Sequence, residues 1–272
     1  MSYEYTTEDI EYIRHDKPFK LRLYKPRGAG PFPAVVDLHG GAWGKGSLEE
    51  CKGRDEVLAR SGLLVAALDF RDGNHGYPTA LVDINYAIRW LKARAQQLQT
   101  RADLIGISGQ SSGGHLAMLV AMRPDDPRYA AIPLSSAPRL DATVACLATR
   151  SPISDTVARF AQAETMKREA MIENNRIYFN PWDSIHDGNP QAILERRETP
   201  TLVPMLIMQG ALDDNVLPAV QEKFAATYRA AGGVCGLTVF EGCEHEWVAH
   251  PGPQTTRAQE MAAAFFARHL KA

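Results

Sequence analysis

The segment from Leu104 to Met122 constrains the fold more than any other part of the sequence. An apolar run of strand length, Leu104–Ser108, leads through Gly109-Gln110-Ser111-Ser112-Gly113-Gly114 into a small-residue stretch of helical character, Ser112–Met122. A serine in a G-x-S-x-G turn between a strand and a helix lies on a sharp bend with its hydroxyl exposed. The glycines are needed because the backbone on either side passes too close for larger side chains. The segment therefore predicts a buried strand followed directly by a helix, with Ser111 as a candidate nucleophile.

The rest of the chain alternates in the same way between short apolar runs and longer amphipathic stretches. This alternation is typical of a mainly parallel sheet covered by helices, an α/β architecture. The other expected strands are Ile10–His15, Phe19–Tyr24, Ala34–Leu38, Leu63–Asp69, Ala130–Leu134, Met205–Gln209 and Leu237–Phe240. The other expected helices are Leu48–Arg60, Thr79–Ala95, Asp155–Asn174, Leu217–Ala231 and Thr255–Leu270.

Residues 137–200 fit the alternation less well than the remainder. Asp155–Asn174 has helical spacing, but the stretch from Tyr178 to Thr201 holds several prolines among polar residues. We expect one domain spanning residues 1–272, with 137–200 as an insertion over the carboxyl edge of the sheet. The insertion is a candidate lid or pocket wall; a surface excursion with no role in binding is the alternative.

Composition and charge exclude several classes of protein. The formal net charge of −2 over 272 residues gives no concentrated basic face for nucleic acid. No apolar run is long enough to span a bilayer, and the polar N-terminus MSYEYTTEDIEY is unlike a signal peptide, so a cytoplasmic protein is expected. The four cysteines lack metal-site spacing and are too few for a disulfide framework, so neither a metal nor a cofactor is expected.

A second glycine-rich motif follows the expected strand Ala34–Leu38. His39-Gly40-Gly41-Ala42-Trp43 matches loops whose backbone N–H groups converge on one point and stabilise an oxyanion. We expect the donors to be the N–H groups of Gly41 and Ala42, with that of Ser112 as a third. Trp43 is a candidate substrate-binding residue; packing beneath the loop is its alternative role.

A serine nucleophile needs a base, and the base needs an orienting acid. Two aspartates, Asp213 and Asp214, follow the expected strand Met205–Gln209, and Asp213 is preferred because the spacing Gly-x-x-Asp-x-x-Val is usual for such an acid loop. His245 follows the last expected strand in a polar loop, which is the right species in the right order. His250, close to the same loop, is the fallback.

With these residues in place, the chain resembles the α/β-hydrolase family, in particular its acetyl-esterase and hormone-sensitive-lipase-like serine esterases. The motifs that carry the resemblance cover most of the chain: His39–Trp43, Asp69-Phe70-Arg71 with Tyr77-Pro78, Gly109–Ala117, Gly210–Val216 and Gly242–His245. The resemblance implies an eight-stranded, mostly parallel sheet and a metal-free acyl-enzyme mechanism on carboxylic esters. Ala42 and Ser112 depart from the residues often found at their positions, but each keeps its backbone N–H.

The expected function is hydrolysis of small to medium carboxylic esters by Ser111, His245 and Asp213. The first alternative is an amidase of the kynurenine-formamidase kind with the same triad, which the HGG-x-W form of the loop also resembles. A non-catalytic binding module on a hydrolase fold is a more distant alternative. The expected partner is a small-molecule ester, and a homodimer is compatible with the sequence.

Overall fold

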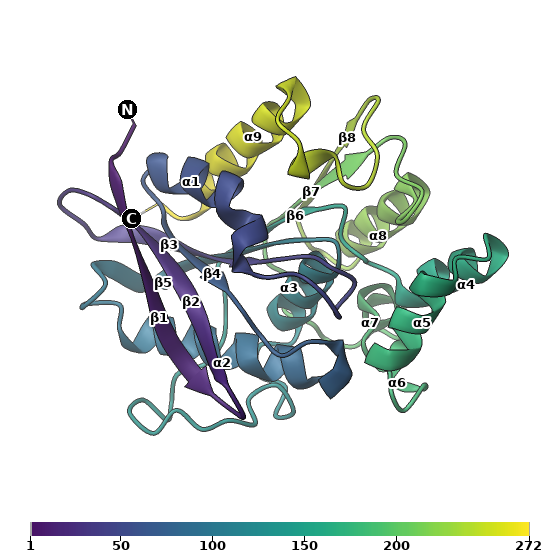
Figure 1. Ribbon diagram of the computed structural model, residues 1–272, viewed down its shortest axis with the longest axis horizontal. Coiled ribbons are helices and arrows are strands. Elements are labelled where there is room, and N and C mark those ends of the chain that lie inside the picture. The colour runs from purple at the N-terminus through teal and green to yellow at the C-terminus, as the bar shows by residue number, and fades with distance from the viewer. Residues whose placement is uncertain (1, 272) are drawn as a thin grey trace.

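The computed structural model describes residues 2–271 and is built around one eight-stranded sheet (Figure 1). Its strand order is β1-β2-β4-β3-β5-β6-β7-β8. β1 and β2 form an antiparallel hairpin that joins β4 in antiparallel register, and all later neighbours are parallel. The strands are β1 (Tyr5–Arg14), β2 (Pro18–Pro26), β3 (Phe32–Leu38), β4 (Leu64–Leu68), β5 (Thr100–Gln110), β6 (Cys146–Arg150), β7 (Met205–Gly210) and β8 (Cys235–Phe240).

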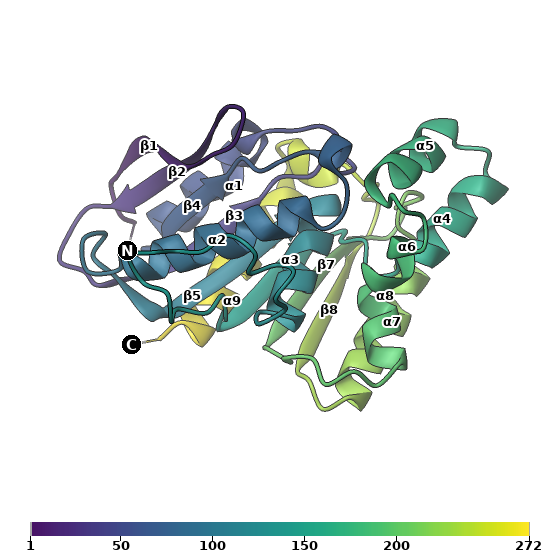
Figure 2. The same ribbon diagram turned by 90° about the horizontal axis from the view of Figure 1, so that it is seen from below.

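Helices cover both faces of the sheet. α1 (Lys52–Arg60) and α9 (Pro253–His269) pack in one apolar cluster, and α2 (Thr79–Ala93), α3 (Ser112–Met122) and α8 (Pro218–Ala230) pack in the other (Figure 2). The central strands are buried along their whole length, as β4 and β7 show, because both of their faces lie against helices. Edge strand β1 is mostly exposed. None of the helices within residues 2–271 is long and apolar enough to cross a membrane.

One predicted strand is wrong. Ala130–Leu134 lies in irregular structure, and the strand that follows α3 in the sheet is β6, Cys146–Arg150. Pro133 lies within the predicted run and cannot donate its share of a ladder of hydrogen bonds, which argues against a central strand. β6 is short and ends on Arg150, so its apolar signal in the sequence is weak.

The predicted insertion therefore begins later than residue 137. It leaves the sheet after Arg150 and returns at Met205, and it carries the short helices α4 (Thr156–Thr165), α5 (Glu169–Tyr178), α6 (Ser184–Asp187) and α7 (Pro190–Glu195). α4 and α5 lie at the end of the molecule opposite to β1 and the two termini (Figures 1 and 2). The first residues of the insertion lie against the candidate nucleophile, because the Ile153 N–H donates to the Ser111 carbonyl at 3.3 Å.

Candidate active site

Ser111 lies at the turn between β5 and α3, as the sequence predicted. Its backbone has φ 52° and ψ −119°, a conformation that side chains rarely adopt and that turns Oγ out of the strand direction. The turn is closed by two glycines: a Cβ on Gly109 would overlap the carbonyl of Gly113, and a Cβ on Gly113 would overlap the carbonyl of His39. Gly113 thus brings the serine turn into direct contact with the loop that follows β3.

Three side chains from separate loops form a continuous hydrogen-bonded chain. His245 Nε2 lies 2.9 Å from Ser111 Oγ, and His245 Nδ1 lies 2.9 Å from Asp213 Oδ2 and 3.0 Å from Oδ1. The loops follow β5, β7 and β8, whose carboxyl ends lie at one edge of the parallel sheet. The arrangement allows the imidazole to take a proton from the serine hydroxyl while the carboxylate holds the Nδ1–H tautomer.

The acid loop distinguishes Asp213 from its neighbour. The Asp213 side chain is fully buried and accepts hydrogen bonds from Gln209 Nε2 at 2.8 Å and from the N–H groups of Asn215 and Val216 at 3.0 and 2.8 Å. Burial acts to raise the pKa of Asp213, but the contact with His245 and the backbone donors outweigh it and lower the pKa. Asp214 is exposed and pairs with Arg168. Only Asp213 contacts the candidate base.

The loop after β3 has three successive residues with positive φ: Gly41 at 99°, Ala42 at 50° and Trp43 at 63°. It is closed by a hydrogen bond of 3.0 Å from the Lys45 N–H to the Gly41 carbonyl, where a Cβ on residue 41 would overlap Lys45. Such a turn directs successive N–H groups to one side of the backbone. The loop meets the serine turn at Gly40, where a Cβ would stand 3.3 Å from the Gln110 carbonyl oxygen and 3.5 Å from Ser111 Cβ. Ser112 is the first residue of α3.

The ring of Trp43 is buried beneath the loop. The indole is 3% exposed, stacks on Tyr178 with centroids 4.8 Å apart, and donates from Nε1 to His115 Nδ1 at 3.1 Å. His115 is buried and its Nε2 lies 2.7 Å from the Gly188 carbonyl; burial lowers its pKa to about 4, so the ring is neutral and Nδ1 is free to accept. This packing favours the alternative role, and contact of Trp43 with a substrate stays a prediction.

A buried ionic cluster beneath this loop was not predicted from the sequence. Arg54 of α1 donates to Asp37 Oδ2 of β3 at 2.6 Å, to the Leu38 carbonyl at 3.1 Å, and to Gln110 Oε1 at 3.1 Å. It thereby joins the ends of β3 and β5, just before His39 and Ser111. The available signal was an acidic residue inside the apolar run AVVDL, which requires a buried partner.

The same cluster contains the best geometric candidate for a metal site among residues 2–271. Asp37, Cys51 and Asp55 each place one potential ligand atom within 4.8 Å of the others. Arg54 already donates to both Asp37 and Cys51, at 2.6 and 2.9 Å, so a guanidinium occupies the place that a cation would need. The donor set therefore does not fit a metal ion.

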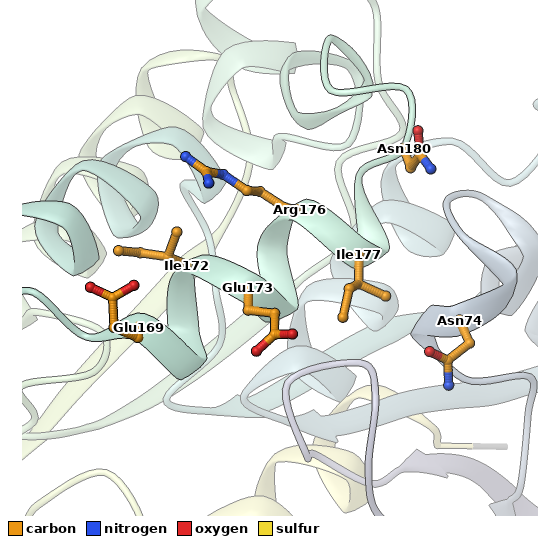
Figure 3. A pocket seen from close by; sticks show the side chains of 7 residues that line it. All are labelled: Asn74, Glu169, Ile172, Glu173, Arg176, Ile177 and Asn180. Carbon is orange, nitrogen blue, oxygen red and sulfur yellow. The ribbon is translucent and has the colours of Figure 1, made fainter.

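One surface cavity lies along α5, away from the triad. It measures about 510 Å³ and faces the loop before α2 (Figure 3). The residues that line it are Asn74, Glu169, Ile172, Glu173, Arg176, Ile177 and Asn180. It contains no member of the triad and mixes acidic, basic and apolar side chains without a convergent set of donors.

Comparison with known proteins identifies the family of the chain and several relatives. The BD-FAE family model matches residues 21–227. Esterase LipC of Mycobacterium tuberculosis is 32% identical over 86% of this chain and 58% of its own length, and the probable carboxylic ester hydrolase LipM of the same organism is 32% identical over 44% of this chain and 29% of its own length. The chain thus spans between about a third and a little over half of these relatives.

Solved structures give the same fold. The propionate-bound esterase Est2 of Thermogutta terrifontis aligns over 96% of this chain and 94% of its own, with a TM-score of 0.76 and 25% identity. The carboxylesterase EstE1, cloned from a metagenomic library, aligns over 100% of this chain and 92% of its own with a TM-score of 0.82 and 24% identity, which supports the fold alone. The predicted α/β-hydrolase fold is confirmed.

Proposed function

Since the chain belongs to the BD-FAE family, we propose that it is a serine hydrolase of small to medium carboxylic esters. The observation that carries the proposal is the position of His245, whose two ring nitrogens lie 2.9 Å from Ser111 Oγ and 2.9 Å from Asp213 Oδ2. The relatives described above are named as ester hydrolases, which favours an ester over an N-formyl amide. A complete nucleophile, base and acid also argues against a binding module.

In the first half of the reaction, Ser111 Oγ attacks the ester carbonyl carbon while His245 Nε2 takes the hydroxyl proton. The carbonyl oxygen becomes an oxyanion, which the N–H groups of Gly41, Ala42 and Ser112 stabilise in this proposal. The intermediate collapses when the carbon–oxygen bond to the alcohol breaks and the imidazolium gives its proton to the leaving oxygen. The product is an acyl group on Ser111.

In the second half, a water molecule gives its proton to His245 and attacks the acyl carbon. A second oxyanion forms at the same N–H groups and collapses, returning the proton to Ser111 Oγ and releasing the carboxylic acid. Asp213 stays ionised throughout, because its hydrogen bonds keep its pKa low.

Turnover of p-nitrophenyl esters from acetate to octanoate by the wild type and by Ser111→Ala tests the proposal. We expect steady turnover by the wild type, with the fastest rates on the shorter acyl chains, and loss of turnover in the variant. Turnover that survives in a folded Ser111→Ala protein would show that another residue is the nucleophile. No turnover of any ester, together with hydrolysis of N-formylkynurenine, would move the assignment to an amidase.

A cytoplasmic location and a homodimer remain predictions. The four cysteines are all buried thiols with no disulfide between them, a state that a reducing compartment maintains.

A further inference from the structure

Arg159 of α4 is a buried cation without a carboxylate of its own. Its side chain is 2% exposed, and no carboxylate oxygen in the part of the chain that the structure describes lies within ion-pair distance of it. Nε and Nη2 both donate to Asn215 Oδ1, at 3.0 and 2.8 Å, whereas Nη1 is buried and has no acceptor among residues 2–271. The guanidinium therefore retains unused donors and an unbalanced charge.

This guanidinium contacts residues of two loops that adjoin the triad. Its carbon atom Cζ stands 5.6 Å from the ring centroid of Trp43, which follows the proposed oxyanion donor Ala42. On the other side, Asn215 belongs to the acid loop and donates its N–H to Asp213. The loop leading into α4 is also tied to the nucleophile, through the hydrogen bond from Ile153 to Ser111.

The surrounding charges do not neutralise Arg159. The charge of Asp213 acts to raise the pKa of Arg159. The oxygens of Asp213, however, are already hydrogen-bonded to His245, to Gln209 and to the backbone of the acid loop. Arg168 adds a like charge, and burial, the largest effect, lowers the pKa of Arg159 to about 10. A buried charge of this kind is costly unless a partner of opposite sign completes it.

We propose that Arg159 is a specificity residue that binds a carboxylate carried by the ester substrate. This inference rests on the proposed ester-hydrolase function and narrows it to half-esters of dicarboxylic acids or to esters of carboxylated alcohols. The carboxylate can belong to the acyl part or to the alcohol part of the ester. In either case it would accept a hydrogen bond from Arg159 Nη1. The carboxylate would supply the missing acceptor and the missing negative charge in one contact.

Two pairs of esters test the proposal, each pair matched in size and differing in one negative charge. For the acyl side, the mono-p-nitrophenyl ester of glutaric acid is compared with p-nitrophenyl pentanoate. For the alcohol side, 4-acetoxybenzoate is compared with its methyl ester. The quantity measured is the ratio of kcat/KM for the charged ester to that for the neutral one, in the wild type, Arg159→Met, Arg159→Lys and a control, Arg168→Gln. Arg168 has the same charge but is partly exposed and already paired with Asp214.

In Arg159→Met, we expect the ratio for one of the two pairs to fall about ten-fold or more, because the variant loses a hydrogen bond between charged groups. The fall should come from a higher KM for the charged ester. Arg159→Lys should retain part of the preference, and Arg168→Gln should retain all of it. The pair that responds identifies the side of the ester that carries the carboxylate.

An equal fall for charged and neutral esters would overturn the inference, because it would make Arg159 a positioning residue for the acid loop. If Arg159→Met fails to fold, product inhibition of the wild type decides the question. Glutarate should inhibit hydrolysis of a neutral ester more strongly than pentanoate, or 4-hydroxybenzoate more strongly than its methyl ester. Equal inhibition within both pairs contradicts the proposal. Failure of the proposed function is a separate result, in which the wild type hydrolyses neither ester of either pair.

Discussion

Two buried aspartate sites lie at the carboxyl edge of the same sheet and are constructed in opposite ways. Around Asp213, an amide side chain and two backbone N–H groups saturate the carboxylate that faces His245. Around Asp37 and Asp55, beneath the loop after β3, two guanidinium groups supply the positive charge, and several atoms have no hydrogen-bond partner among residues 2–271: Asp37 Oδ1, both Asp55 oxygens and Arg150 Nη2.

The difference shows how each carboxyl group is kept in its protonation state. Neutral donors hold Asp213 ionised without adding a full positive charge, so its negative charge remains available to an imidazolium at His245. In the cluster, burial and the charge of Asp37 raise the pKa of Asp55, whereas Arg54 and Arg150 keep that of Asp37 low against its own burial. The first site is suited to catalysis and the second to joining β3, β5, β6 and α1.

The largest expected effect is at the first site. Asp213→Asn should lower kcat by roughly 10⁴-fold, because the amide favours the wrong imidazole tautomer and removes the charge that stabilises the imidazolium. Steady-state kinetics on a short-chain p-nitrophenyl ester measures it, with circular dichroism to verify the fold. A kcat within about ten-fold of the wild type would show that a different acid orients His245.

A change in the ionic cluster around Asp37 and Asp55 should lower the stability of the fold. Arg54→Met leaves Asp37 buried without its closest counter-charge and should lower the free energy of unfolding by about 3–5 kcal/mol. Urea denaturation measures the change. The control is Arg101→Met, which removes an exposed pair with Asp103 and should leave the free energy of unfolding nearly unchanged, because solvent screens such a pair. Equal losses in the two variants would mean that the cluster contributes no more than a surface ion pair.

Asp55→Asn tests the protonation state within the cluster. Because the pKa of Asp55 is higher in the folded protein than in the unfolded chain, the wild type loses stability as the pH rises above the unfolded value of about 4. The variant has no such group, so its free energy of unfolding should rise relative to the wild type by about 1 kcal/mol or more between about pH 4 and pH 8. A difference that does not vary with pH would indicate that Asp55 is ionised in the folded protein.

The smallest expected effect belongs to Asp214, the neighbour of the proposed catalytic acid. Asp214→Asn removes an exposed contact with Arg168 and should change the free energy of unfolding by less than about 1 kcal/mol and kcat by no more than about three-fold. The same denaturation and kinetic measurements apply. A large loss of kcat in this variant, with little loss in Asp213→Asn, would reverse the assignment of the acid.

The elements that the sequence predicts correctly are those with strong local signals. The Ser111 turn, the glycine-rich loop and the spacing of Asp213 are written in contiguous residues, and the long apolar runs of β3, β4 and β7 identify buried strands. Asp213, His245 and Ser111 were expected to meet because their loops follow strands of one parallel sheet. The structure brings the three together.

The errors arise where the deciding contact is distant in sequence. β6 has a weak signal of its own and is defined by its pairing with β5 and β7 on either side. Arg150 can be buried at its end because it donates a hydrogen bond to Ser108 and lies in the ionic cluster. Trp43 stacks on Tyr178, which belongs to the insertion and is distant in sequence. Arg54 lies in an amphipathic helix where a charged residue normally faces solvent, so only the three-dimensional structure shows its contact with Asp37.

The close approach of Gly113 to the His39 carbonyl has a consequence for how the proposed active site can diverge. The nucleophile turn and the oxyanion loop meet backbone to backbone, so neither can change shape without displacing the other. We therefore expect mutations that alter substrate range while preserving turnover to fall outside these two segments. The acid loop and α4, joined by the hydrogen bonds from Arg159 to Asn215, take no part in that contact, and a directed-evolution library is best concentrated there.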